Sequence, residues 1–310
     1  MNAFARHSGQ GFGSLYLKRP MRESLRRVSL VGDDAASLLY DREAARVINS
    51  LSTRLKEVIT FDVEVTISSH ERKSLVRRLD KFAPAGLHAV LDDAASGFYP
   101  SNRLGLFGKG GRLQALRLAY EHGKHLDANV FYFLKNRQVR DVIVDELRRQ
   151  VCLFKDSFGY VPAHLSSHNG WWNFPSVMEA FAQVSGESRI PVRVRREDMH
   201  GILKQSPWET GAVVDNHNVK GREDLVRSPE KFARFVVTTL EERGVRAGEV
   251  VLHMRSNPEY RYRLQLELLS HRDFWTAMEA VGINLVTPHE LLVHPVSAVN
   301  PVAEKAVLAA

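Results

Sequence analysis

The sequence predicts an α/β fold with a mainly parallel sheet, closed or open, and helices outside it. Strand signals alternate with helical signals along the chain, which is the pattern of strands joined by helical crossovers. The 310 residues are 44% hydrophobic and 25% charged, which is enough apolar material for a substantial core. We find no repeat, no low-complexity linker and no window of about eighteen apolar residues, so we predict one soluble domain without a membrane span.

The individual elements follow from hydrophobic periodicity. Short apolar or alternating runs predict strands at 28–34, 59–69, 85–93, the start of 161–174, 190–197, 248–256 and the start of 283–292. Apolar residues at three- and four-residue spacing predict helices at 36–51, 70–82, 137–158, 175–186, 229–244 and 272–282. Two stretches lack such signals. Residues 97–136 predict a long loop with one helix near 113–120, and residues 198–229 predict irregular structure.

The basic charge of the chain lies mainly at its N-terminus. The formal net charge is +7, and residues 1–27 contribute +5 of it through six basic residues against one acidic residue. The body is therefore close to neutral, and we do not expect a nucleic-acid partner. We predict that residues 1–27 form a flexible basic extension, 28–294 the single domain and 295–310 a C-terminal tail.

The single cysteine bears on the compartment. Cys152 has no partner for an internal disulfide and lies between Val151 and Leu153 in a predicted helix. We expect its thiol in the core and the protein in a reducing, cytoplasmic compartment.

Polar side chains follow or end several predicted strands. These residues are Asp33, Asp34, His88, His164, His168, Arg195, Arg196 and His253. Because the carboxyl ends of parallel strands meet at one rim, we expect these side chains to lie together. Carboxylate oxygens and imidazole nitrogens bind zinc and similar ions, so the pattern predicts a divalent metal with open coordination positions.

Each of these residues also has a purely structural interpretation. Asp34 has the position of a helix N-cap. His88 and His253 could be hydrogen-bonded histidines of the core or surface. The arginines could lie on the solvated rim. Spacing alone leaves these alternatives open.

The order of several short motifs resembles the YdjC/ChbG family of carbohydrate deacetylases over residues 28–292. The motifs are VGDD, GLH, VDELRRQV, PAHLSSHNGWWNFPSVMEAF, IPVRVRRE, VVLHMRS and GINLVTPHEL. The resemblance implies a distorted (β/α) barrel that removes acetyl groups from N-acetylated amino sugars with a divalent metal, magnesium or zinc. Carried over by motif, it implies that Asp34, His88 and His168 hold the metal and that Asp33 is the base.

The expected chemistry is amide hydrolysis. A metal on these ligands would lower the pKa of a bound water from about 15.7 towards 7 and would polarise the amide carbonyl. Asp33 would accept the proton of the water. We choose His253 over His164 as the acid that protonates the departing amine.

Substrate contacts are expected beside the metal ligands. Trp171 and Trp172 follow His168 closely, and their faces suit the apolar side of a sugar ring, although either could be a core anchor under the loop. Arg195 could bind a carboxylate, phosphate or hydroxyl of the substrate. We add His164 to this predicted set.

Two functions from different classes follow. The first is a metal-dependent N-deacetylase acting on a small N-acylated sugar, with a homodimer as a further expectation. The second is a catalytically inactive family member that serves as a carbohydrate-binding or protein-interaction module. The second is favoured by an altered loop, in which Ser166 stands where the family has Asp, and Gly170 and Trp172 stand where it has His.

Overall fold

The fold is known for most of the predicted body. The computed structural model describes residues 26–92, 94, 98–99, 103–121, 135–169, 174–194, 209–214, 224–253 and 260–293. The strands in these residues are β1 (Arg26–Asp33), β2 (Ile59–Val63), β3 (Gly86–Ala89), β4 (Leu165–Ser167), β5 (Val192–Val194), β6 (Glu209–Val214), β7 (Ala247–His253) and β8 (Ile283–Leu285). The predicted basic extension and C-terminal tail lie outside the described residues, apart from Arg26 and Arg27.

The described strands form one parallel sheet that closes on itself. Its order is β2-β3-β4-β5-β6-β7-β1-β8, and β1 pairs with β2 as well. All of the pairings are parallel. Because β1 pairs with β7 along one edge and with β2 along the other, β1 to β7 make a ring, and β8 joins beside the start of β1. The predicted distorted (β/α) barrel with parallel strands is confirmed.

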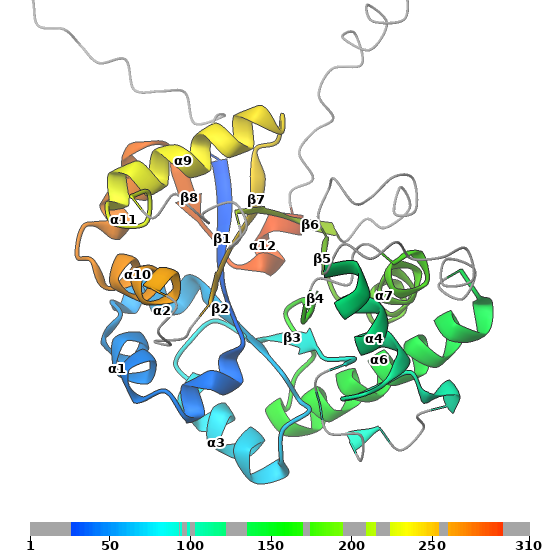
Figure 1. The fold of residues 1–310 in the computed structure, drawn as a ribbon. Helices are drawn as coiled ribbons and strands as arrows, with labels where there is room; N and C mark the ends of the chain where they lie inside the picture. The colour runs from blue at the N-terminus through cyan, green and yellow to red at the C-terminus, as the bar shows by residue number, and fades with distance from the viewer. Residues whose placement is uncertain are drawn as a thin grey trace, which may run out of the picture.

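Helices surround this ring (Figure 1). They are η2 (Ala35–Leu39), α1 (Arg42–Ser50), α2 (Thr53–Val58), α3 (Ser69–Leu79), η4 (Arg103–Gly105), α4 (Arg112–Glu121), α6 (Arg137–Phe158), α7 (Pro175–Ser188), α9 (Pro229–Glu242), α10 (Tyr260–Ser270), α11 (Phe274–Ala280) and α12 (Pro288–Val293). In Figure 1, α1 to α3 and α9 to α11 lie on the left, whereas α4, α6 and α7 lie on the right. The longest described helix, α6, packs against α7 and β3.

Local sequence explains where the main helices begin and end. Ser68 and Glu71 form a reciprocal capping box at the start of α3. The Asn136 side chain accepts the backbone N–H of Gln138 at the start of α6, and Gly159 ends that helix with a positive φ of 78°. The predicted end of this helix at Gly159 is confirmed.

Several predicted boundaries need correction. The first strand begins at Arg26, two residues early, so Arg26 and Arg27 belong to the barrel and not to the extension. The strand predicted over 59–69 is shorter in the structure. It ends at Val63, and the end of the predicted range belongs to α3, which begins at Ser69. The predicted helix at 36–51 is split into η2 and α1. The stretch 198–229, predicted as irregular, contains β6. We also did not predict α2, α10 or α12.

Two other features of the described chain bear on the sequence predictions. No described helix is long and apolar enough to cross a membrane. Cys152 is exposed on α6, so its predicted place in the core is wrong. The buried stripe of that helix is formed by neighbours such as Val151 and Phe154.

The strands present different chemistry to their two faces. One face joins the apolar core under the helices, as Ile59, Phe61 and Val63 of β2 show. Side chains along a strand point alternately to its two faces, so the residues between these positions point to the inner face of the ring. The buried polar residues on the inner face are Ser29, Asp33, Thr60, Asp62, His88, Ser166, Arg193 and Glu249. The inside of the barrel is therefore polar and charged, and this interior supports the site.

Candidate metal and catalytic site

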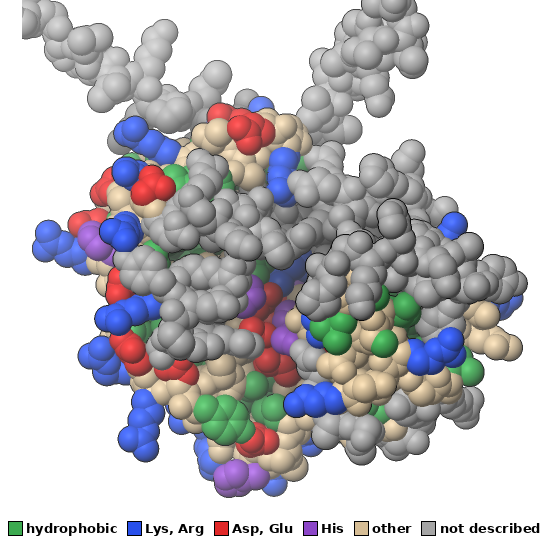
Figure 2. Space-filling model, in the orientation of Figure 1, with side chains coloured by type: hydrophobic (Ala, Val, Ile, Leu, Met, Phe, Trp, Pro, Cys, Tyr) green, Lys and Arg blue, Asp and Glu red, His purple; other side chains and the backbone are tan. Residues whose placement is uncertain are grey.

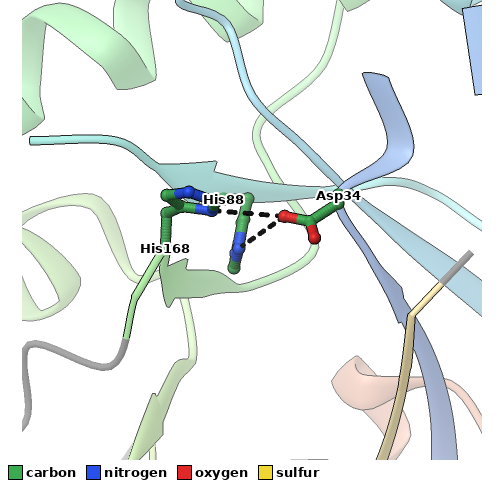
Figure 3. Close-up of side chains that lie close together, drawn as sticks. All are labelled: Asp34, His88 and His168. Carbon is green, nitrogen blue, oxygen red and sulfur yellow. Dashed lines mark ion pairs between the residues drawn. The ribbon is translucent and has the colours of Figure 1, made fainter. Parts of the chain in front are cut away.

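Asp34, His88 and His168 come together at the carboxyl end of the barrel (Figure 3). Asp34 Oδ1 lies 3.2 Å from His168 Nδ1 and 3.6 Å from His88 Nε2. One ligand atom from each residue lies within 4.8 Å of the other two. His168 is held in place because its backbone N–H donates to the carbonyl of Ala89 at the end of β3.

The local structure at Asp34 excludes its alternative role as a helix cap. Asp34 precedes η2, but its side chain makes no capping hydrogen bond. Its φ of 57° is in the left-handed region, which a residue other than glycine adopts at some cost. Burial by itself would raise the pKa of this carboxyl, but the hydrogen bond with His168 and the charges of the surrounding histidines together outweigh burial and hold the pKa well below its ordinary value. The carboxylate is therefore ionised and turned toward the imidazoles.

The donor set fits a divalent metal. One carboxylate oxygen and two imidazole nitrogens are typical ligands of zinc and similar ions, and three protein ligands leave positions open for water and substrate. Burial, reinforced by the nearby His168, lowers the pKa of His88 to about 3, so its ring is neutral near pH 7. Neutral imidazole is the form that coordinates a metal.

A buried ion network lies directly below these residues. Arg193 donates from Nη1 to both oxygens of Asp33 at 2.9 Å, from Nη2 to Asp62 at 2.8 Å and from Nε to Glu249 at 2.6 Å. The four residues are 5% exposed or less. Burial raises the pKa of Asp33 well above its ordinary value, and the charges of Asp62 and Asp34 add to this, although the charge of Arg193 opposes it.

Sequence reasoning missed this network because it looked only at strand ends. Arg193 stands between Val192 and Val194 of β5, and Asp62 stands between Phe61 and Val63 of β2. A charged side chain at an alternate position within an otherwise apolar strand was the available signal.

His164 lies inside the barrel and not at its mouth. Its ring has no exposed surface, and its Nε2 lies 2.9 Å from Asp62 Oδ1 and 3.4 Å from Arg193 Nη2. In this position the ring supports Asp62, and its predicted substrate contact stays a prediction. Gly86 makes this packing feasible, because a Cβ there would lie 2.2 Å from Asp62 Oδ1.

His253 and Glu64 approach the triad from two other strands. His253 ends β7 opposite Asp33 of β1, is half-buried, and is one of the charges that lower the pKa of Asp34. Glu64 follows β2 and accepts the backbone N–H of Ala36 at 3.0 Å. Burial, with the charge of Asp34 adding to it, raises the pKa of Glu64 to about 7. Sequence reasoning did not select Glu64.

The remaining predicted contacts cannot be located in the same way. Trp171, Trp172 and Arg195 lie outside the described residues, so their predicted substrate contacts stay predictions. The adjoining Asn169 has a φ of 62°, and its amide approaches Asp92 Oδ1 at 3.4 Å. Figure 2 shows acidic and histidine side chains gathered at the centre of this face, between the two groups of helices.

Comparison with known proteins identifies the family of the chain. The family model described as YdjC-like protein matches residues 63–306. This match begins at the end of β2, and the pairing of β1 with β7 brings Asp33, and Asp34 directly after it, to the matched region. No functionally curated protein matches the chain.

Among solved structures of low identity, one has a TM-score above 0.5 and shares the fold, and others are similar at lower scores. A "putative cellobiose-phosphate cleavage protein" from Enterococcus faecalis V583 is 17% identical, with a TM-score of 0.58, over 86% of this chain and 99% of that chain. A CE4 family pseudoenzyme from Bacillus anthracis is 12% identical, with a TM-score of 0.44, over 87% of this chain and 66% of its own. A family 4 acetyl xylan esterase from Clostridium thermocellum, in complex with a cobalt ion, is 14% identical, with a TM-score of 0.42. The match covers 86% of this chain and 91% of that chain.

Proposed function

The chain belongs to the YdjC-like family, and on that premise we propose that it is a metal-dependent carbohydrate deacetylase. The substrate class is a small N-acylated amino sugar, and the reaction is hydrolysis of its amide. The observation that carries this proposal is the meeting of Asp34, His88 and His168 from separate strands around one point, with Asp33 directly beside them.

The three ligands and their surroundings favour a particular kind of metal. Two imidazoles with one carboxylate suit zinc, iron or cobalt better than magnesium, which prefers oxygen ligands only. When bound, such an ion supplies positive charge that polarises the amide carbonyl and makes water more acidic. Of the two predicted metals, we therefore propose a zinc-like ion over magnesium.

Asp33 is the proposed base. Its raised pKa makes it a stronger proton acceptor near neutral pH than an ordinary aspartate. Arg193 holds both of its oxygens, which fixes the direction of the carboxylate and keeps it in the barrel. Proton transfer from an attacking water to Asp33 then requires little movement of the protein.

His253 is the proposed acid for the departing amine. It lies at the end of β7, beside Asp33 in the strand register, and its half-buried ring has access to the rim. Its backbone N–H donates to Gln265 on α10, which anchors the end of the strand. An imidazolium here would give its proton to the amine nitrogen as the amide C–N bond breaks.

Metal analysis and an acetate-release assay test the proposal together. We expect about one zinc-like ion per chain and acetate release from one or more N-acetylated mono- or oligosaccharides. The panel should include phosphorylated disaccharides, because the name of the Enterococcus faecalis relative refers to such a compound. Asp34→Asn and His168→Ala should lose both metal and activity, whereas His271→Ala, which removes an exposed histidine, should retain both.

Two results would overturn the proposal. A folded protein that binds no divalent metal after exposure to zinc or cobalt would point to the alternative, a catalytically inactive sugar-binding or interaction module. Metal binding without acetate release from any sugar of the panel would reject the deacetylase assignment. The homodimer, the cytoplasmic location and the lack of a nucleic-acid partner stay predictions.

A further inference from the structure

A chain of hydrogen bonds links one proposed metal ligand to the charged interior. His88 Nδ1 lies 2.7 Å from Ser166 Oγ, and the Ser166 hydroxyl also bonds to Asp62 Oδ2. The three residues come from β3, β4 and β2, and His88 and Ser166 are register partners in the sheet. Ser166 and Asp62 have no exposed surface, so water does not compete for these bonds.

The number of available protons sets the direction of each bond. Asp62 accepts from Arg193 Nη2, and its carboxyl also faces His164 Nε2. Because the guanidinium of Arg193 is paired with it inside the barrel, the Asp62 carboxyl is a carboxylate and can only accept. Ser166 has one hydroxyl proton and gives it to Asp62. Its oxygen can then only accept from His88, which requires a proton on Nδ1 of that ring.

This direction leaves a lone pair on the other nitrogen of His88. Nε2 faces Asp34 Oδ1 at 3.6 Å, so two electron-rich atoms point toward each other inside the protein. A proton on Nε2 would give a poor bond at that separation, and the single proton of Ser166 could then serve only one of its two partners, His88 Nδ1 or Asp62. A cation between Nε2 and the carboxylate removes the repulsion, and 3.6 Å is short enough for both atoms to reach one ion.

We propose that Ser166 and Asp62 are positioning residues that hold His88 in the Nδ1–H tautomer, so that its Nε2 lone pair stays available to the divalent metal. This inference rests on the proposed function, because it assumes the same metal site. Partners on the second nitrogen of a ligand histidine orient the ring, and their removal typically weakens metal binding about 10- to 100-fold. Here the carboxylate acts on the ligand through one serine hydroxyl and not by direct contact.

The first test is the tautomer in the metal-free wild-type protein. Selective ¹⁵N labelling of histidine, with two-bond ¹H–¹⁵N spectra, distinguishes Nδ1–H from Nε2–H rings, and His88→Gln identifies the signals of His88. We expect the Nδ1–H form at pH 7.5 in the presence of a chelator. An Nε2–H ring in the wild-type protein would overturn the inference without any variant of Ser166.

The second test is metal affinity in matched serine variants. Ser166→Ala should shift His88 toward the Nε2–H form and weaken zinc binding about 10- to 100-fold in competition with a chromophoric chelator. Ser185→Ala is the control, because Ser185 of α7 is equally buried and donates to the Ile190 carbonyl, just after the end of that helix. The control should bind zinc as the wild type does.

The outcomes separate this inference from the proposed function. If the wild type binds no zinc, the proposed metal site itself fails. If the wild type binds zinc but Ser166→Ala keeps both the affinity and the tautomer, the metal site stands and the positioning role is rejected. Thermal unfolding of Ser166→Ala and Ser185→Ala shows whether a lost affinity reflects the site or the fold.

Discussion

Replacing Gly86 by alanine should disrupt the polar interior of the barrel from β3. A Cβ at this position would lie 2.2 Å from Asp62 Oδ1 and 2.6 Å from His164 Cε1. Neither side chain can move away easily, because both are fully buried and Asp62 is held by Arg193. The added methyl group would therefore push the Asp62 carboxylate away from His164 and Arg193, with which it is paired.

The expected loss is about 3 kcal/mol. Overpacking of a closed interior typically costs about 1–3 kcal/mol, and full separation of a buried ion pair costs about 3–5 kcal/mol, so the estimate lies where these ranges meet. For a chain of this length, 1 kcal/mol corresponds to about 2 °C in Tm, so the midpoint should fall by about 6 °C. Zinc affinity should fall as well, because Asp62 supports Ser166 and through it His88.

Urea denaturation and thermal unfolding followed by circular dichroism measure this loss. Gly186→Ala is the matched control, because Gly186 lies within α7 and a Cβ there meets nothing within 4 Å. This variant should gain about 0.5–1 kcal/mol, since alanine is the better helix former. If Gly86→Ala loses less than about 1 kcal/mol, Asp62 and His164 do not pack against β3 as described, and the reasoning is refuted.

Arg193→Met should destabilise the fold by about 3–5 kcal/mol, because three buried carboxylates lose their cation; a loss below about 1 kcal/mol in urea denaturation contradicts the network. Between its ordinary pKa of 4.5 and the raised value of about 7, Glu64 keeps a proton in the folded state that the unfolded chain has released, so its contribution to stability falls as the pH rises through this window. As the pH rises from 5 to 8 in the presence of a chelator, Glu64→Gln should therefore become more stable relative to the wild type. A difference in the free energy of unfolding that stays constant with pH would contradict this. The exposed Cys152 thiol should react with a thiol reagent in the folded protein, and Cys152→Ser should change stability by less than about 0.5 kcal/mol; protection of the thiol until unfolding would show that it is buried.

The kinds of element were largely predictable because periodicity and caps are local properties. The spacing of apolar residues in 137–158 and the glycine at 159 identified α6 with its correct end. The ends of the strands were predicted less well. The strands β4 and β5 have only three residues each and form because they pair with neighbouring strands. The strand β6 was missed within a stretch whose local signals indicate irregular structure, and it forms by pairing with β5 and β7.

The candidate ligands were predictable for a different reason. The strand positions predicted that a set of polar residues would meet at one rim, and the family resemblance selected Asp33, Asp34, His88 and His168 from that set. The residues that support them were not found in this way. Arg193, whose side chain joins the others, lies within a strand, where a single sequence does not reveal which side chains it will face.

The sequence by itself determined the order of strands and helices, and it determined that strands such as β2 have one apolar and one polar face. It did not determine where the polar face points. Alternation in β2 is equally compatible with a sheet that exposes Thr60 and Asp62 to water. Only the closure of β1 onto both β2 and β7 turned these side chains inward. Buried charges must be paired, so closure required Arg193 to meet its three carboxylates and brought His88 to Ser166 and Asp34.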